Sequence, residues 1–343
     1  MTQLVALWNI SLLLCAVALL ALAGILLARL VSESRTVRRT EERRRIVGFL
    51  MDGNQSPIPP PRGALEQDAA AKVTLELAEL VRGPERTALL ERAQQISIHR
   101  ILMRQSVSRS AQQRLQAAEA LAMFPKGRER VRQMLRDANP DVRLGAALAL
   151  AQNQAAPPAR ELVRQLALGT RERSLLSASL MRDLADHDPA SVEELLTDPA
   201  TPPSTRLAAL DALAASGRVE HAPLVAKMAG ESAHDRDLLA RIHHALGRIG
   251  HPSGHDAIHQ GLANPAWEVR AAAAQAAGRT GLAPAAETLG GLLGDDHWWV
   301  RFRAAEALWR LGASGRAVLE RVAREGQTPA REAAAVTLRE RAA

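Results

Sequence analysis

The chain has 343 residues, of which 47% are hydrophobic, yet aromatic residues make up only 2% and tyrosine is absent. This bias argues against a β-sandwich, which is enriched in β-branched and aromatic side chains, and favours an all-α fold. The net charge of +7 is compatible with nucleic-acid or membrane partners, whereas the lone Cys15 excludes an intrachain disulfide and a zinc site built from several cysteines.

Residues 1–30 predict a transmembrane anchor. No charged side chain precedes Arg29, and the apolar stretch 4–27 is long enough to cross the hydrocarbon core of a bilayer. Positive charges follow this stretch instead of preceding it, which disfavours a cleavable signal peptide. We therefore expect a single-pass protein of the cell inner membrane, with its N-terminus outside and the rest of the chain in the cytoplasm.

Residues 31–51 predict a basic juxtamembrane segment. Residues 29–50 carry seven arginines and three glutamates, a net charge of +4, which leaves +3 for the rest of the chain. Because this excess lies beside the membrane, we assign it to anionic lipid headgroups and not to nucleic acid. The segment either continues the membrane helix or lies along the bilayer surface. The arginines expected to face lipid are Arg35, Arg38, Arg39, Arg43, Arg44 and Arg45.

Residues 52–63 predict a proline-rich linker. Four prolines within DGNQSPIPPPRG favour an extended conformation, and a docking motif for a proline-reading domain is the alternative. Residues 64–109 have a helical pattern but lack the small residues of the following repeats. They are therefore expected to form an N-terminal helical cap.

Residues 110–343 repeat one helical pattern. An anchor arginine is followed three, four, six and seven positions later by small or apolar residues, as Arg143 is by Ala146, Ala147, Ala149 and Leu150. A unit of this length holds two helices of about 10 to 14 residues and two turns, so the array is predicted to be an α-solenoid. The anchors stand 29 to 33 residues apart, at positions 114, 143, 173, 206, 239, 270, 301 and 331, with leucine at 239.

Two features of the repeat have structural roles. We expect the anchor arginines to bond acidic side chains or carbonyls in the turns of a neighbouring repeat, which is a structural ladder and not chemistry. Glycine eleven residues after an anchor is typical of a left-handed helix end. This position holds Gly217, Gly250, Gly281 and Gly312.

The segments DANPDVRLGAALALA (137–151) and DDHWWVRFRAAEALWRLG (295–312) resemble HEAT repeats of the short, phycobilisome-lyase-like type. The resemblance covers about residues 85–343 and implies an armadillo-like superhelix that acts as a scaffold for another protein. Because the sequence contains no catalytic motif and the repeats are nearly neutral, we expect no cofactor, no small-molecule substrate and no nucleic acid. The anchored form is similar to bacterial proteins of membrane polysaccharide synthesis. This likeness implies a membrane-associated partner from such a system.

The tryptophans of the last repeats are the candidate partner-binding residues. Trp267 and Trp298 each stand three residues before an anchor, so we expect them to stack in equivalent positions of adjacent repeats. A packed ridge of turns is one interpretation, and a surface rich in tryptophan and arginine that binds a partner is the other. The candidates are Trp267, Trp298, Trp299, Arg303 and Trp309.

A histidine cluster at residues 234–259 is the candidate metal site. His255 and His259 stand four residues apart on a predicted second helix, with His243 on the preceding helix, and such spacing allows two imidazoles to share a metal ion. No third ligand is specified, and the His-Glu steps of HEAT-type deoxyhypusine hydroxylases are absent. We therefore expect no enzymatic activity; a metal-dependent or lyase-type HEAT enzyme is the alternative.

Overall fold

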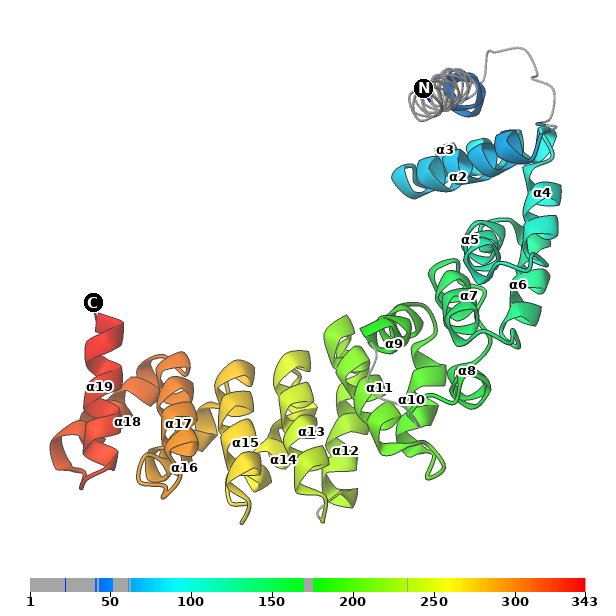
Figure 1. The fold of residues 1–343 in the computed structure, drawn as a ribbon. Coiled ribbons are helices and arrows are strands. Elements are labelled where there is room, and N and C mark those ends of the chain that lie inside the picture. Colours follow the sequence, from blue (N-terminus) through cyan, green and yellow to red (C-terminus); the bar gives the residue numbers. More distant parts are fainter. Residues whose placement is uncertain are drawn as a thin grey trace, which may run out of the picture. The chain divides into compact units, whose positions relative to one another are not determined.

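The computed structural model in Figure 1 describes Leu22, Glu41, Pro61 and residues 43–51, 63–169, 175–232 and 234–342. All regular elements in these ranges are helices, which confirms the all-α prediction. Apart from Leu22, the predicted membrane span 4–27 lies outside the described residues, as do Arg35, Arg38, Arg39, Arg173 and linker residues 52–60. No helix within the described ranges combines the length and apolar character that crossing a bilayer requires.

The chain forms two compact units, Met1–Ala149 and Leu150–Ala343. In the first unit, α2 contacts α3, α4 and α5, and α5 contacts α6, so the unit consists of helices packed in sequence order. Its helices are α2 (Ala64–Leu80), α3 (Gly83–Gln95), α4 (Ile98–Gln105), α5 (Ala111–Ala122), the 3-10 turn η1 (Pro125–Gly127), α6 (Arg128–Met134) and α7 (Pro140–Gln152), whose last residues belong to the second unit.

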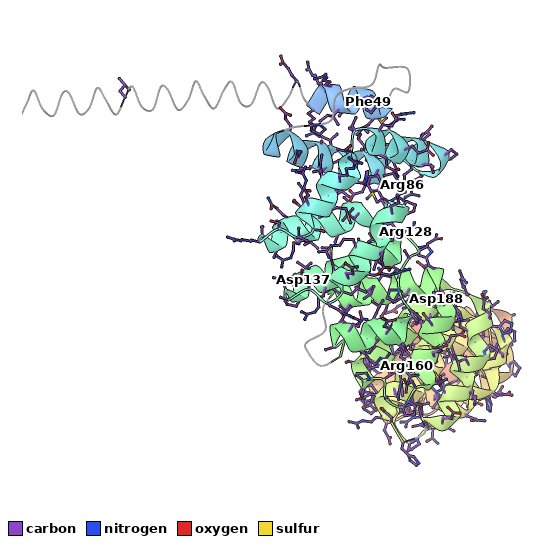
Figure 2. The ribbon with its side chains drawn as sticks, turned by 90° about the vertical axis from the view of Figure 1, so that its right-hand side faces the viewer. Phe49, Arg86, Arg128, Asp137, Arg160 and Asp188 are labelled. Atoms are coloured by element: carbon purple, nitrogen blue, oxygen red, sulfur yellow. The ribbon has the colours of Figure 1, made fainter. Side chains whose placement is uncertain are left out.

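Residues 43–51 belong to the first unit. They are helical, and Ile46, Phe49 and Leu50 are buried. The guanidinium of Arg92 in α3 donates a hydrogen bond to the carbonyl oxygen of Leu50. Figure 2 labels Phe49 on this helix. The apolar side of this helix therefore packs against protein, which differs from the amphipathic helix on the bilayer surface that was one prediction. Continuation of the membrane helix stays a prediction.

The second unit is a two-layer array of helix pairs. The first helices of the pairs, α9, α11, α13, α15, α17 and α19, lie side by side, and α10, α12, α14, α16 and α18 form the second layer (Figure 1). The helices are α8 (Ala159–Leu166), α9 (Leu175–His187), α10 (Pro189–Thr197), α11 (Pro203–Ser216), α12 (Ala222–Glu231), α13 (Arg236–Ile249), α14 (His255–Gly261), α15 (Trp267–Thr280), α16 (Ala286–Leu292), α17 (Trp298–Arg310), α18 (Ala313–Glu325) and α19 (Ala330–Ala342). The 3-10 turns are η2 (Val219–His221), η3 (Pro252–Gly254) and η4 (Ala283–Ala285).

The repeat pattern follows from this packing. The residues three, four, six and seven positions after the anchors at 114, 143, 206, 239, 270 and 301 are buried, as Ala273, Ala274, Ala276 and Ala277 are in α15. Their small volume allows close approach of neighbouring first helices, and a Cβ atom on Gly278 would lie only 2.6 Å from the Cα atom of Ala307. Helices in such contact exclude water from the layer and bury apolar surface along its length.

Gly217, Gly250 and Gly281 end their helices as predicted, whereas α17 ends at Arg310 with Leu311 as its cap and Gly312 precedes α18. Gly250 and Gly281 have φ angles of +72° and +68°, a left-handed conformation that disfavours residues with a Cβ atom. Gly281 is the C-cap residue of α15, and its backbone N–H donates a hydrogen bond to the carbonyl oxygen of Ala277. The helices α11, α13 and α15 therefore end at the same position of the repeat.

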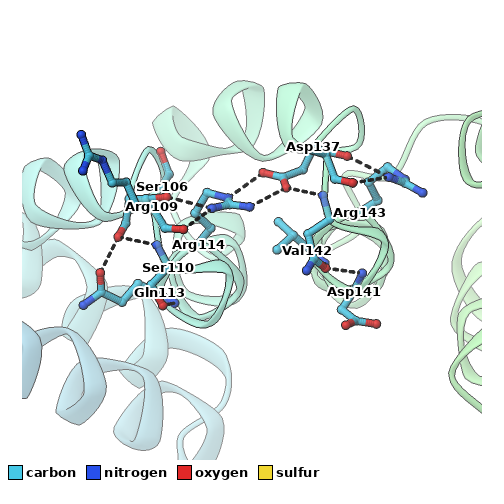
Figure 3. A network of polar contacts seen from close by, with 12 residues as sticks. Ser106, Arg109, Ser110, Gln113, Arg114, Asp137, Asp141, Val142 and Arg143 are labelled. Carbon is cyan, nitrogen blue, oxygen red and sulfur yellow. Dashed lines mark hydrogen bonds and ion pairs between the residues drawn. The ribbon is translucent and has the colours of Figure 1, made fainter.

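Two anchor arginines, Arg114 and Arg270, form the predicted contact with an acidic side chain of the next turn. In the first unit, Arg114 donates two hydrogen bonds of 2.8 Å to the carboxylate of Asp137, which lies in the turn before the next first helix (Figure 3). Arg143, the anchor of that helix, donates to the backbone carbonyl oxygen of Asp137 at 2.9 Å. Asp137 therefore links two successive anchors. The side-chain hydrogen bonds from Arg114 lower the pKa of its carboxyl group.

The same arrangement recurs in the second unit. Arg270 donates to both carboxylate oxygens of Asp295 at 2.7 and 2.9 Å, and Arg301 donates to the carbonyl oxygen of Asp295 at 2.8 Å. Where the anchor is Leu239, the corresponding turn residue is Asn264. The arginine and its acidic partner are therefore absent together, so neither leaves an unpaired charge behind.

Candidate functional site

An aromatic patch, defined as Trp298, Trp299 and Phe302, lies on the first two turns of α17. The side chains are 54%, 43% and 43% exposed, which is unusual for rings of this size. The ring centroids of Trp298 and Trp299 lie 4.7 Å apart in an edge arrangement, and the Trp298 and Phe302 rings stack at 5.5 Å. These mutual contacts fix the rings, so the patch presents a preorganised apolar surface.

Charged groups border the aromatic patch on the same helix. The guanidinium of Arg303 lies 5.5 Å from the Trp299 ring centroid and donates to Glu306 at 2.9 Å. Arg310 donates to the other oxygen of Glu306 at 2.8 Å. Burial opposes ionisation of Glu306, but the two arginines outweigh this effect and lower its pKa. One carboxylate therefore holds two guanidinium groups in place, which leaves a net positive charge beside the rings.

Trp267 and Trp309 pack within the protein more than the patch residues do. Trp267 begins α15 as Trp298 begins α17, but its ring stacks on His297, with centroids 3.5 Å apart, and not on Trp298. The expected stacking of equivalent tryptophans is therefore wrong. Trp309 is half-buried beneath the guanidinium of Arg316, 5.1 Å away. A shallow groove beside Trp267 is lined by Arg236, Pro265, Ala266, Glu268, Arg270, Asp296 and His297.

One face of the first helices α13, α15 and α17 carries a polar pattern with the repeat's period. Residues five positions after the anchors in α13, α15 and α17 are polar, and an arginine follows each of them four residues later. These residues are exposed or half-buried, whereas the positions between them are largely buried. The polar residues are His244, Gln275 and Glu306, and the arginines, which we call the arginine row, are Arg248, Arg279 and Arg310.

His244 reports the electrostatics of this face. Burial lowers its pKa, and the positive charges of Arg241, Arg279 and Arg303 lower it further, while a hydrogen bond with Gln275 acts in the opposite sense. Those three arginines belong to α13, α15 and α17. Guanidinium groups of three successive first helices therefore act together on one imidazole.

The histidines predicted as metal ligands do not come together. His243 is buried, and burial lowers its pKa to about 4. Its ring packs against Gly261, where an added Cβ would lie 2.4 Å from the imidazole Nε2 atom. His255 is half-buried and His259 is exposed. Across the described residues, no group of three or more histidine, cysteine, aspartate or glutamate side chains is arranged to hold a metal ion.

Three of the arginines predicted to face lipid lie in the described helix 43–51. Arg43, Arg44 and Arg45 are exposed, and Arg43 forms an ion pair of 2.7 Å with Glu76 of α2. Exposed pairs of this kind contribute little to stability. These side chains therefore remain on the surface of the first unit.

Several residues of the site were not singled out from the sequence. Phe302 completes the aromatic patch, Glu306 fixes Arg303, and Arg248 and Arg279 belong to the arginine row. The available signal was the recurrence of polar residues at the fifth and ninth positions after the anchors. The small and apolar positions of the repeat do not indicate this recurrence.

Residues 255–339 match a family model described as HEAT repeats. No curated protein sequence matches the chain. The crystal structure of Kap121p is similar at 13% identity, covering 81% of this chain and 37% of that chain with a TM-score of 0.46. The karyopherin Kap121p bound to the extreme C-terminus of the protein phosphatase Cdc14p is similar at 14% identity, covering 85% of this chain and 39% of that chain with a TM-score of 0.47. An engineered protein is similar at 18% identity, covering 87% of this chain and 88% of that chain with a TM-score of 0.37. The chain spans well under half the length of Kap121p.

Proposed function

The chain is a HEAT-repeat protein, and we propose that it is a scaffold whose last repeats bind another protein through the aromatic patch and Arg303. The observation that carries this proposal is the exposure of three clustered rings beside a fixed guanidinium. Burying such rings against a partner gains hydrophobic and cation–π energy with little loss of side-chain freedom, because their mutual contacts already hold them. Binding, and not catalysis, is the proposed role.

The partner proposal is tested by capture of proteins with the full chain in detergent. We expect the double variant Trp299→Ala/Arg303→Ala to retain the partner at least about tenfold less than the parent chain, as truncation of an interface hot spot does. Trp309→Ala/Arg316→Ala is the matched control, since it removes the same kind of cation–π pair from a half-buried position. Undiminished capture by Trp299→Ala/Arg303→Ala would show that the aromatic patch is not the contact surface.

We also propose that residues 1–30 anchor the scaffold in the inner membrane with the repeats in the cytoplasm. The uncharged stretch 4–27 and the arginines that follow it support this proposal. Confinement near the bilayer raises the effective concentration of the scaffold for a membrane-associated partner, even when the intrinsic affinity is modest. A component of a membrane polysaccharide-synthesis system is the partner we propose, on the resemblance to anchored HEAT proteins.

The anchor is tested by fractionation. The full chain should remain with membranes after salt and carbonate washes, whereas a chain lacking residues 1–30 should be released, because the apolar stretch is then missing. The chain with Arg43→Ala, Arg44→Ala and Arg45→Ala is the control. It keeps the apolar stretch and should stay with the membranes. Release of the unaltered chain by carbonate would contradict the anchor.

A further inference from the structure

The chemistry of the partner follows from the arginine row. Arg248 and Arg279 are exposed and take part in no ion pair within the part of the chain that the structure describes. Arg310 shares Glu306 with Arg303, so two positive charges face one carboxylate there. This part of the first-helix face therefore has more guanidinium groups than carboxylates to neutralise them.

The row has a regular spacing set by the helix packing. Its members stand nine residues after the anchors of α13, α15 and α17, which are in direct contact as neighbours. Axes of packed helices lie about 8 to 10 Å apart. The contacts are close, since an added Cβ on Gly247 would lie 2.8 Å from the Cα atom of Ala276. Successive arginines are therefore presented at roughly one helix spacing.

This spacing selects among the backbone conformations of a bound segment. In a polyproline-type extended chain, side chains three residues apart point in the same direction and lie about 9 Å from one another. In a β-strand, residues on one face repeat at about 7 Å, which is shorter than the distance between neighbouring helices, so only one carboxylate would face an arginine of the row. Only the first of these places successive carboxylates over successive guanidinium groups.

We propose that the arginine row binds an acidic segment of the partner protein in an extended conformation, with a carboxylate at every third residue. The proposal rests on the protein-binding function assigned to this face, and it specifies the chemistry of that partner. Arginine binds carboxylates through paired hydrogen bonds, and the excess of guanidinium groups favours approach of an acidic chain. The aromatic patch lies on the same face of α17 as Arg310 and receives apolar side chains next to the acidic stretch.

The test uses the full chain in detergent and two labelled peptides of the same length, with equal numbers of glutamate, alanine and proline. One peptide has glutamate at every third position among alanine and proline. The other has glutamate at every second position, and the residues without glutamate that this closer spacing leaves over stand at its ends. Fluorescence anisotropy should show the first peptide binding at least about threefold more tightly, because only its carboxylates match the row. Equal affinities would overturn the proposed spacing.

Two double variants test the location. Arg248→Ala/Arg279→Ala should weaken the first peptide about fivefold, since two charge pairs are lost, and leave the Glu306 ion pairs intact. Lys227→Ala/Arg321→Ala removes two charges from the second layer and should leave the affinity unchanged. Equal losses in both variants would mean general electrostatic attraction and would overturn the site. If neither peptide binds while Trp299→Ala/Arg303→Ala still abolishes capture of the partner, the result would contradict the acidic segment and leave the proposed protein-binding function supported.

Discussion

Replacing Asp295 by alanine should lower the free energy of unfolding of the α15–α17 region by about 3 kcal/mol. The Asp295 side chain is 7% exposed and that of Arg270 is 18% exposed, so the substitution leaves a largely buried guanidinium without its carboxylate. Because energies in repeat arrays are mostly local, the change is best measured by hydrogen exchange of α15 and α17 amides in the full chain.

Glu287→Ala is the matched control for Asp295→Ala. It breaks an ion pair with Arg321 in which the two side chains are 76% and 46% exposed, so the expected change is below about 0.5 kcal/mol. Comparable destabilisation by the two substitutions would contradict the structural role assigned to the buried pair.

The buried pair also predicts a dependence on pH. Burial raises the pKa of Asp295, but hydrogen bonds from Arg270 and from the backbone N–H of His297 outweigh this effect, so the folded pKa is below the unfolded value of about 3.9. The carboxylate therefore contributes stability above about pH 4, and this contribution is lost as the pH falls through the folded pKa. The Asp295→Ala chain should lack this part of the acid dependence.

Replacing Gly278 by alanine should destabilise the second unit by about 2 kcal/mol, although alanine is the better helix former. The added Cβ atom would lie 2.6 Å from the Cα atom and 2.9 Å from the Cβ atom of Ala307, so α15 and α17 must move apart. Such overpacking against a neighbouring backbone is costly, since the helix cannot rotate a side chain out of the way. Hydrogen exchange of α15 and α17 amides gives the measurement.

Gly291→Ala provides the control of opposite sign. Gly291 lies within α16, and an added Cβ atom would meet nothing within 4 Å. The substitution should therefore stabilise the helix by about 0.5 to 1 kcal/mol through reduced backbone entropy in the unfolded chain. If both glycine substitutions shift stability in the same direction, close helix contact is not what Gly278 provides.

Much of the second unit was predictable because its repeats are under the same local constraints. The spacing of small residues identified the buried side of the first helices, and the glycines marked their ends. The ladder was predictable from an arginine and an aspartate that recur together. Arg270 and Asp295 are an example. The buried side, the helix ends and the ladder all recur at fixed positions of the repeat, so the sequence pattern alone indicates them.

The features that the sequence did not reveal depend on the third dimension. The pattern of residues 43–51 is compatible with lipid or with protein on its apolar side, and only the packing of Phe49 decides between them. The ring of Trp267 stacks on His297, a contact that the spacing of the tryptophans did not indicate. His243 and His259 are similar in sequence context, yet one is buried and the other exposed.

The contact of Gly278 with Ala307 limits how the array can grow. A glycine eight positions after one anchor meets an alanine six positions after the next anchor, and the same pairing joins Gly247 to Ala276. A duplicated copy of the α15 repeat inserted beside the original would provide both the glycine and the alanine of this contact. In α17 the position eight residues after the anchor holds Trp309 and not glycine. If a copy of the α15 repeat followed α17, its alanine six positions after the anchor would therefore meet the Trp309 indole. Gene duplication can therefore lengthen the array inside α13–α17, whereas α17 ends the stretch whose units are interchangeable.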